Sequence, residues 1–121
     1  MNYAQKPLTT TVHTDMNGLI ALEVPKEGCM PGHFYEVFRG LDKDPVTSIN
    51  FQHGPVPANG VNGVTNEALL AIVLHRTRIL DAKFPCKENQ AAIQHLEDAM
   101  AHLEARTYRR QLRGVEGKEV K

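Results

Sequence analysis

The sequence predicts an α+β fold in which N-terminal antiparallel β strands are followed by a C-terminal α-helical hairpin. In the first half of the chain, short runs rich in threonine, aromatic and β-branched residues alternate with turn sequences, as in an antiparallel sheet. In the second half, apolar residues recur every three or four positions, which is the spacing of an amphipathic helix. Residues 54–60 separate the halves, and their two prolines and two glycines predict a loop.

Four short strands are expected in the first half, with a turn between each pair. The turns are Asp15–Gly18, Pro25–Gly28 and Leu41–Pro45, which contain the glycine, proline, asparagine and aspartate residues that favour turns. An antiparallel sheet is the simplest arrangement, because sequential strands joined by short turns tend to pair with one another. The expected strands are Leu8–His13, Gly18–Val24, His33–Arg39 and Val46–Gln52.

Two helices are expected in the second half, joined by a turn at residues 84–89. Thr65 is the expected N-cap of the first helix, and the wide apolar stripe that follows predicts that this helix is mostly buried. The second helix is expected from near Lys87 to Arg113, where Gly114 is a stop signal. Its narrow apolar seam suits antiparallel helix packing and comprises Ile93, Leu96, Met100 and Leu103.

Length and composition restrict the classes of protein. A chain of 121 residues can bury one core, so we expect a single domain over 1–121. Within it we expect a β-rich part at 1–60, a helical hairpin at 61–114 and a tail at 115–121. The tail is expected to be mobile. Lys plus Arg equals Asp plus Glu at 14 each, so bulk charge cannot hold a nucleic acid or a membrane surface. The sequence has two cysteines, no signal segment and no apolar run near the roughly 18 residues of a membrane span, so we expect an intracellular protein.

The strongest candidate binding surface is a row of arginines at the end of the second expected helix. Arg106, Arg110 and Arg113 fall on one helical stripe, with Arg109 at its flank. A guanidinium presents a planar fork of donors that fits a phosphate bidentately and stays charged at physiological pH. From residue 106 onward the chain has six Lys or Arg residues against two acids. An anionic partner is therefore favoured over a solvated face paired with acids such as Glu104.

Asn89 is a second candidate, because an amide can read the edge of a base or ribose; the alternative is a helix cap that accepts a backbone N–H. Asn89 and Arg106 are 17 residues apart, or roughly 25 Å on one straight helix at about 1.5 Å per residue. One small ligand cannot touch both in one chain. Two antiparallel copies of the helix would bring Asn89 of one chain near Arg106 and Arg110 of the other, so shared sites would require a homodimer.

Other side chains carry weaker signals. Phe84 suits a core plug that closes the hairpin better than a platform for stacking on a base. His95 and His102 are about 10 Å apart on a helix, too far for a shared zinc ion, and the sequence predicts no metal site and no cofactor. Ser48 is the only serine, and no nucleophile or phosphate-loop motif is present, which disfavours an enzyme.

Two runs in the middle of the chain, Ile49–Pro55 and Gly60–Ile72, carry a family resemblance together with several shorter matches. The shorter matches are Phe84, Cys86, Glu88–Asn89, Leu96–Glu97, Arg106–Thr107 and Arg113–Gly117. The combination resembles the phage anti-Thoeris sponge family, the first type of Thoeris anti-defense protein. The resemblance covers roughly residues 48–117, and the first 47 residues add little to it.

The resemblance implies a small α+β protein that forms a homodimer and can assemble further into a hexamer. It also implies a function without catalysis in the cytoplasm of the infected bacterial host. Members bind and sequester cyclised ADP-ribose signals made by TIR-domain proteins, which blocks activation of the Thoeris effector. Some relatives also hold cyclic oligonucleotides at a separate site, which we cannot assign here because the loop His53–Asn59 has no arginine or lysine.

By motif position, the resemblance implies that the ligand is contacted by Asn89, Arg106 and Arg110. Arg109 and Phe84 are further candidates for ligand binding. Ile79 stands where relatives are expected to have phenylalanine, so a ring contact to adenine would be replaced by weaker apolar packing. The arginines would then neutralise the two phosphates of the ligand, while Asn89 and the apolar side chains would orient its rings.

Three other functions stay open on the sequence alone. The first is a phosphodiesterase-like enzyme that degrades the same cyclic nucleotide, with His75 or His102 as its base. The second is a nucleic-acid-binding helical hairpin, whose binding would fall steeply with salt. The third is a structural protein whose arginines form only a soluble face.

Overall fold

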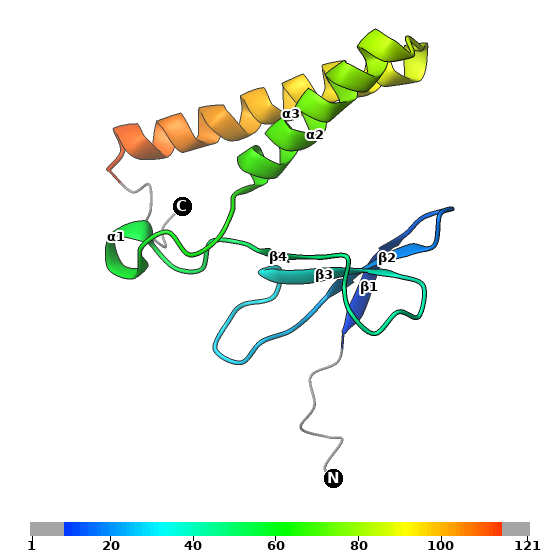
Figure 1. The fold of residues 1–121 in the computed structure, drawn as a ribbon. Coiled ribbons are helices and arrows are strands. Elements are labelled where there is room, and N and C mark those ends of the chain that lie inside the picture. The colour runs from blue at the N-terminus through cyan, green and yellow to red at the C-terminus, as the bar shows by residue number, and fades with distance from the viewer. Residues whose placement is uncertain (1–8, 115–121) are drawn as a thin grey trace. The chain divides into compact units, whose positions relative to one another are not determined.

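The computed structural model describes residues 9–114 and has four strands followed by three helices (Figure 1). The strands are β1 (Thr10–Thr14), β2 (Leu19–Glu23), β3 (Phe34–Arg39) and β4 (Thr47–Asn50). The helices are α1 (Val56–Asn59), α2 (Asn66–Lys83) and α3 (Lys87–Leu112). This order confirms the predicted α+β class, an antiparallel β half followed by a helical hairpin. The predicted tail at 115–121 lies outside the described residues.

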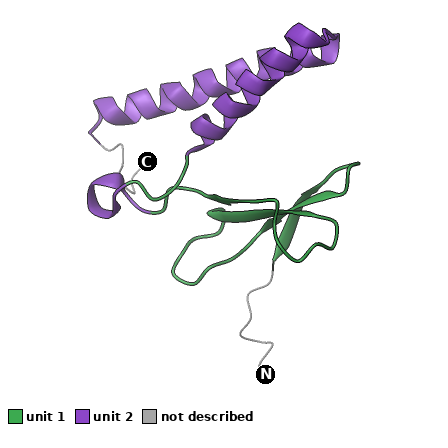
Figure 2. Cartoon of the chain, viewed as in Figure 1, with its two compact units in different colours: residues 1–53, 61–64 green, residues 54–60, 65–121 purple. Residues whose placement is uncertain are grey.

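The chain divides into two compact units (Figure 2). The first unit contains the sheet and comprises residues up to 53 together with 61–64. The second unit contains the helices and comprises residues 54–60 together with the chain from 65 onward. That the whole chain forms a single domain stays a prediction. In the described part of the chain, no helix has the length and apolar character that crossing a membrane requires.

The sheet is a four-stranded antiparallel meander with strand order β1-β2-β3-β4. Each turn brings neighbouring strands into register, for example Ile20 opposite Phe38 and Tyr35 opposite Ile49. In the first turn the Asp15 carboxylate accepts the backbone N–H groups of Asn17 and Leu19, which are 2.9 and 3.0 Å from it. This side chain therefore stabilises the turn and supports the register of β1 and β2.

The segment after β4 returns to the sheet before the helices begin. Phe51 and Val64 form a parallel bridge, and the Asn62 side chain both accepts the N–H of His53 and donates to its carbonyl oxygen. Gly63 lies so close to this strand that a Cβ atom would stand 2.4 Å from the carbonyl carbon of Phe51. Glycine is required at this position because any side chain would collide with backbone.

The prediction that residues 54–60 contain no helix was wrong, since Val56–Asn59 forms the single turn of α1. Both prolines occupy positions where a helix tolerates them: Pro55 is the N-cap, and Pro57 lies in the first turn. N–H groups of a first turn have no partner within the helix, so proline loses no hydrogen bond there. Gly60, at a φ of 68°, ends the turn.

The hairpin of α2 and α3 is held by a seam whose members alternate at spacings of three and four residues. On α2 the half-buried or buried positions with this spacing are Glu67, Leu70, Leu74, Thr77 and Asp81, and Leu69 is half-buried beside them. On α3 they are Asn89, Ile93, Leu96, Met100, Leu103, Thr107 and Arg110, and Ala99 is half-buried beside them. The predicted seam of the second helix is confirmed and continues at both ends. An ion pair between Arg78 and Glu97 also joins the two helices.

The helix ends follow the capping rules. The Thr65 hydroxyl accepts the N–H of Ala68, so the predicted N-cap of α2 is confirmed. α3 begins at Lys87 and ends at Leu112, with Arg113 as its C-cap and Gly114 at a φ of 72°. This agrees with the predicted bounds and with the glycine stop signal.

The prediction that the first hairpin helix is mostly buried was wrong for the single chain. Leu74, which is 6% exposed, is the one buried apolar residue among those described, whereas Ile72 is 63% and Ile79 is 56% exposed. α2 has apolar side chains on more than one side, and α3 covers only the side that forms the seam. An apolar stripe in a sequence predicts that a face is covered, but it does not say whether the same chain covers it.

Replacing Leu74 by alanine is expected to lower the free energy of unfolding by about 2–5 kcal/mol, because it removes buried methyl groups and leaves a cavity in the seam. Urea unfolding followed by circular dichroism measures the change. Leu112→Ala is the matched control: Leu112 is 70% exposed, so its truncation should alter stability by no more than about 0.5 kcal/mol. Equal effects of the two substitutions would contradict the assigned seam.

Candidate anion-binding site

The last turns of α3 carry four arginines at positions that the helix itself favours. Arg109 and Arg110 lie in the last turn, and the backbone N–H of Arg113 donates to the carbonyl oxygens of Arg109 and Gln111. The carbonyl end of a helix has partial negative charge, so cationic side chains are stabilised there.

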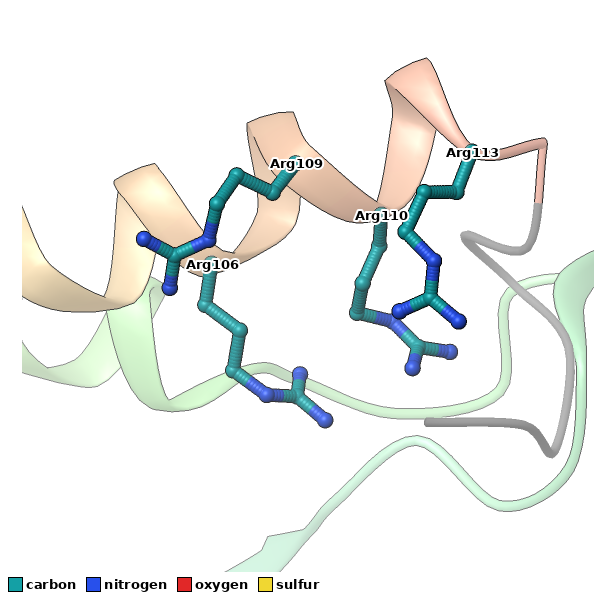
Figure 3. Close-up of a pocket in the computed structure, with 4 residues that line it drawn as sticks. All are labelled: Arg106, Arg109, Arg110 and Arg113. Atoms are coloured by element: carbon teal, nitrogen blue, oxygen red, sulfur yellow. The ribbon is translucent and has the colours of Figure 1, made fainter.

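These four side chains line one hollow of about 400 Å³, which is formed by Arg106, Arg109, Arg110 and Arg113. Figure 3 shows that Arg106, Arg110 and Arg113 extend from the same side of α3, while Arg109 turns back along the helix toward Arg106. The predicted grouping of these arginines is therefore present in the structure. We call this hollow the arginine pocket.

The four arginines differ in burial. Arg110 is 8% exposed and occupies the last position of the hairpin seam, whereas the other three side chains are exposed. Within residues 9–114, Arg106, Arg109 and Arg113 form no ion pair; the ion pairs found there join Arg39 to Asp42 and Arg78 to Glu97. The exposed guanidinium groups can therefore meet a ligand from solvent.

Glu104, the acid considered as a partner for the arginines, lies on another side of α3. It lines a separate hollow of about 270 Å³ together with Glu67, Thr107, Tyr108 and Gln111. α3 thus separates its charges, with arginines on one side of its last turns and an acid on another. A solvated face neutralised by Glu104 does not describe the arginine pocket.

Like charges on neighbouring helical positions repel one another. Arg106 and Arg110 are four residues apart, as are Arg109 and Arg113, and two further pairs are three apart. Each such pair of equal charges destabilises a helix by about 0.2–0.5 kcal/mol. An anion in the pocket would remove this repulsion and accept charge-assisted hydrogen bonds from several guanidinium groups.

The other candidate residues lie at the opposite end of the hairpin. Asn89 is half-buried in the first turn of α3, while Phe84 and Ile79 belong to the end of α2 and are exposed. Asn89 and Arg106 lie on the same helix, 17 residues apart, which is about 25 Å at 1.5 Å per residue. A single chain therefore does not bring Asn89 together with the arginines.

Two expectations at this end of the hairpin need correction. The cap of α3 is Cys86, whose Sγ accepts the N–H of Asn89 at 3.4 Å, so the Asn89 side chain is not the cap. Phe84 is 66% exposed and is not a plug in the hairpin core of the single chain. The Asp81 carboxylate closes the turn instead by accepting the N–H of Cys86. Both candidate side chains thus have surface available to a ligand.

Arg113 was recognised in the arginine row but was not predicted to contact a ligand, although it lines the pocket. Its spacing was the available signal, since it lies three residues after Arg110 and four after Arg109. Among the described residues, no group of three or more His, Cys, Asp or Glu side chains could hold a metal ion. The side chains that line the pocket are all cationic hydrogen-bond donors.

The chain thus combines an antiparallel sheet with a helical hairpin, and the second helix of the hairpin ends in a pocket of cationic side chains. The profile of the family described as Acb2/Tad1, hairpin domain, matches residues 43–108. The chain belongs to this family, and its predicted resemblance to the anti-Thoeris sponge proteins is confirmed.

One curated relative is Thoeris anti-defense 1 of Bacillus phage SBSphiJ7, which is 46% identical over 77 residues. The match covers 63% of this chain and 54% of the relative, so the chain spans about half the length of the curated relative that it matches. The matched family region, residues 43–108, contains the whole of α2 and most of α3. It ends at residue 108, so of the four pocket arginines Arg106 lies inside it, and Arg109, Arg110 and Arg113 lie beyond it.

Proposed function

We propose that this protein is a phage anti-Thoeris protein that binds and sequesters a cyclised ADP-ribose signal made by TIR-domain proteins. The name of its relative, Thoeris anti-defense 1, supports the biological role. The arginine pocket supports the mode of action, because it offers guanidinium donors to the two phosphates of such a ligand. The effect would be stoichiometric: each bound signal molecule is withheld from the Thoeris effector.

The lining of the pocket favours binding over turnover. All four lining residues are arginines, and a guanidinium does not lose its proton in a protein, so none of them can act as a general base. His102 lies one helical turn before Arg106 and does not line the pocket. An enzyme would need a base within hydrogen-bond reach of the reacting atoms, and the pocket does not supply one.

A second copy of the chain would complete the site. The ligand needs both phosphate contacts and contacts to its rings, and the groups suited to these tasks, Arg106 and Asn89, lie at opposite ends of α3. Antiparallel pairing of two hairpins would place the ring-binding end of one chain beside the arginine pocket of the other. Ile72 and Val73, exposed at 63% and 48%, provide apolar surface on α2 for such a pairing.

In this arrangement the exposed apolar residues near Asn89 have a role. Ile79 and Phe84 would pack against the flat face of the adenine, and the Asn89 amide would hydrogen-bond to a base or ribose edge. Ile79 offers less contact area than an aromatic ring would. Ring recognition would then depend more strongly on Phe84 and on the amide.

The function is tested by incubating the purified protein with TIR-derived cyclised ADP-ribose, removing free nucleotide by filtration and denaturing the retained protein. Mass spectrometry of the released material is expected to show the intact nucleotide at about one molecule per shared site. A changed mass would identify an enzyme. Failure to retain or alter the nucleotide would rule out the nucleotide function and leave a nucleic-acid-binding or structural hairpin.

Arg106→Ala is expected to weaken nucleotide binding by about 1.5–3 kcal/mol, or roughly tenfold to over a hundredfold, through the loss of charge-assisted hydrogen bonds. Isothermal titration calorimetry of the folded variant measures the change. Arg39→Ala is the matched control: Arg39 does not line the pocket, and its ion pair with Asp42 is exposed and contributes little. Unchanged affinity in Arg106→Ala would remove this residue from the site.

Sharing of the site between two chains is expected to appear in a mixing experiment. Asn89→Ala and Arg106→Ala should each bind poorly alone, because each homodimer lacks one half of both sites. In a mixed dimer, one site would combine the intact Asn89 of one chain with the intact Arg106 of the other. Random mixing should restore about one quarter of the sites, as measured by titration. If no sites were restored although the chains exchange, each site would belong to one chain.

A further inference from the structure

We propose that Asp81 is a positioning residue: it occupies the N–H group at the start of α3 that the Asn89 side chain would otherwise bind, and so keeps the Asn89 amide available to a ligand. The family resemblance implies a ligand contact for Asn89 and no role for Asp81. This inference deepens the proposed function and rests on it for the ligand role of Asn89, whereas the competition for the N–H group is a property of the free protein.

The first turn of α3 has backbone N–H groups that need acceptors from outside the helical hydrogen-bond pattern. Two such acceptors are present. The Cys86 Sγ accepts the N–H of Asn89 at 3.4 Å, and the Asp81 carboxylate accepts the N–H of Cys86 at 3.2 Å. Asp81 therefore binds the N–H of the N-cap residue itself.

Asn89 lies three residues after the N-cap, and from this position a side chain can reach back to the N–H of the cap residue. The Asn89 carbonyl oxygen is therefore the local competitor for the N–H of Cys86. Asp81 already binds that N–H, and the structure gives the Asn89 amide no hydrogen-bond partner within residues 9–114. The amide thus keeps both its donor and its acceptor for another molecule.

The charge of Asp81 explains why it wins this competition. Asp81 is half-buried in the last turn of α2, where the partial negative charge of the helix end disfavours a carboxylate. Its favourable partner belongs to the next helix, because the start of α3 has partial positive charge. An ionised carboxylate also accepts a stronger hydrogen bond than a neutral amide does. The N–H of Cys86 therefore prefers Asp81 to Asn89.

Packing holds Asn89 in place while its amide is free. Asn89 is the first half-buried seam residue of α3, so contact with α2 sets its backbone position and part of the side chain still meets solvent. Such an amide can pair with a base or ribose edge without first breaking a hydrogen bond within the protein. Asp81 thereby preorganises this end of the hairpin for a ligand.

The first test compares two substitutions that remove the same charge from the full-length protein. Asp81→Ala removes the acceptor, so Asn89 should turn to the N–H of Cys86, and the affinity for cyclised ADP-ribose is expected to fall about threefold to tenfold. Asp81→Asn keeps an acceptor oxygen and should stay within about twofold of the wild type. Asp98→Ala is the matched control, since Asp98 accepts a hydrogen bond from Gln94 on an exposed part of α3, and it should bind like the wild type. Isothermal titration calorimetry measures each affinity.

The second test repeats Asp81→Ala in the Asn89→Ala variant. A residue that acts only through Asn89 has no further effect once the amide is gone, so the double variant should bind within about twofold of Asn89→Ala. A merely structural role, in which loss of Asp81 frays the start of α3, would weaken binding in both backgrounds.

The third test needs no ligand. Hydrogen exchange of the Cys86 backbone N–H, followed by nuclear magnetic resonance, reports whether this group is bound. It should be protected in the wild type through Asp81 and in Asp81→Ala through Asn89. It should exchange faster only in the double variant, which lacks both acceptors.

The outcomes separate this inference from the proposed function. If the wild type bound the nucleotide and Asp81→Ala bound it equally well, or lost affinity equally in both backgrounds, the positioning role would be overturned and the sponge function would stand. If the wild type bound no nucleotide, the sponge function would fall, together with the ligand role of Asn89. Fast exchange of the Cys86 N–H in Asp81→Ala would overturn the competition itself. Circular dichroism of each variant confirms that a loss of binding is not a loss of folding.

Discussion

The packing of α2 against α3 determines the orientation of every candidate side chain in the helical unit. Along both helices the seam positions are separated alternately by three and by four residues, and Leu74 is the buried apolar residue among those described. Because the seam fixes which side of α3 faces α2, it also fixes which sides remain free. Arg110 is the last member of the seam, and Arg106, Arg109 and Arg113 are exposed around the same pocket. The arrangement of the arginines is therefore a consequence of hairpin packing.

The same packing leaves α2 with exposed apolar side chains such as Ile72 and Ile79. A helix that is apolar on several sides is typical of one that has more than one neighbour. The seam with α3 accounts for one neighbour, and a second copy of the chain would account for another. Pairing of two copies would thus cover apolar surface and complete a ligand site through the same contact, which links the stability of the assembly to the binding of its ligand.

The periodic features of the fold were predictable from the sequence, whereas features that depend on partners were not. The strands, the Thr65 cap, the seam of α3 and the arginine row follow from spacing and local chemistry. The α1 turn was missed because proline tolerance depends on the exact position within a first turn. The exposure of Phe84 and of much of α2 was missed because an apolar pattern does not reveal whether the covering surface belongs to the same chain.

A pocket lined only by arginines recognises negative charge and the spacing of phosphates, but it cannot distinguish one nucleotide diphosphate from another. Guanidinium groups donate hydrogen bonds equally well to any phosphate oxygen of suitable geometry. Discrimination must therefore come from groups that read the base and ribose, and Asn89, Phe84 and Ile79 are the candidates at the far end of the hairpin. If abundant cellular diphosphates can enter the pocket, selectivity for a cyclised signal depends on a second set of contacts. The ligand must then touch the arginine pocket and the base-reading end of a hairpin at the same time. Two antiparallel chains would provide that combination, so the separation of the two groups along α3 would make dimerisation a condition for selectivity as well as for affinity.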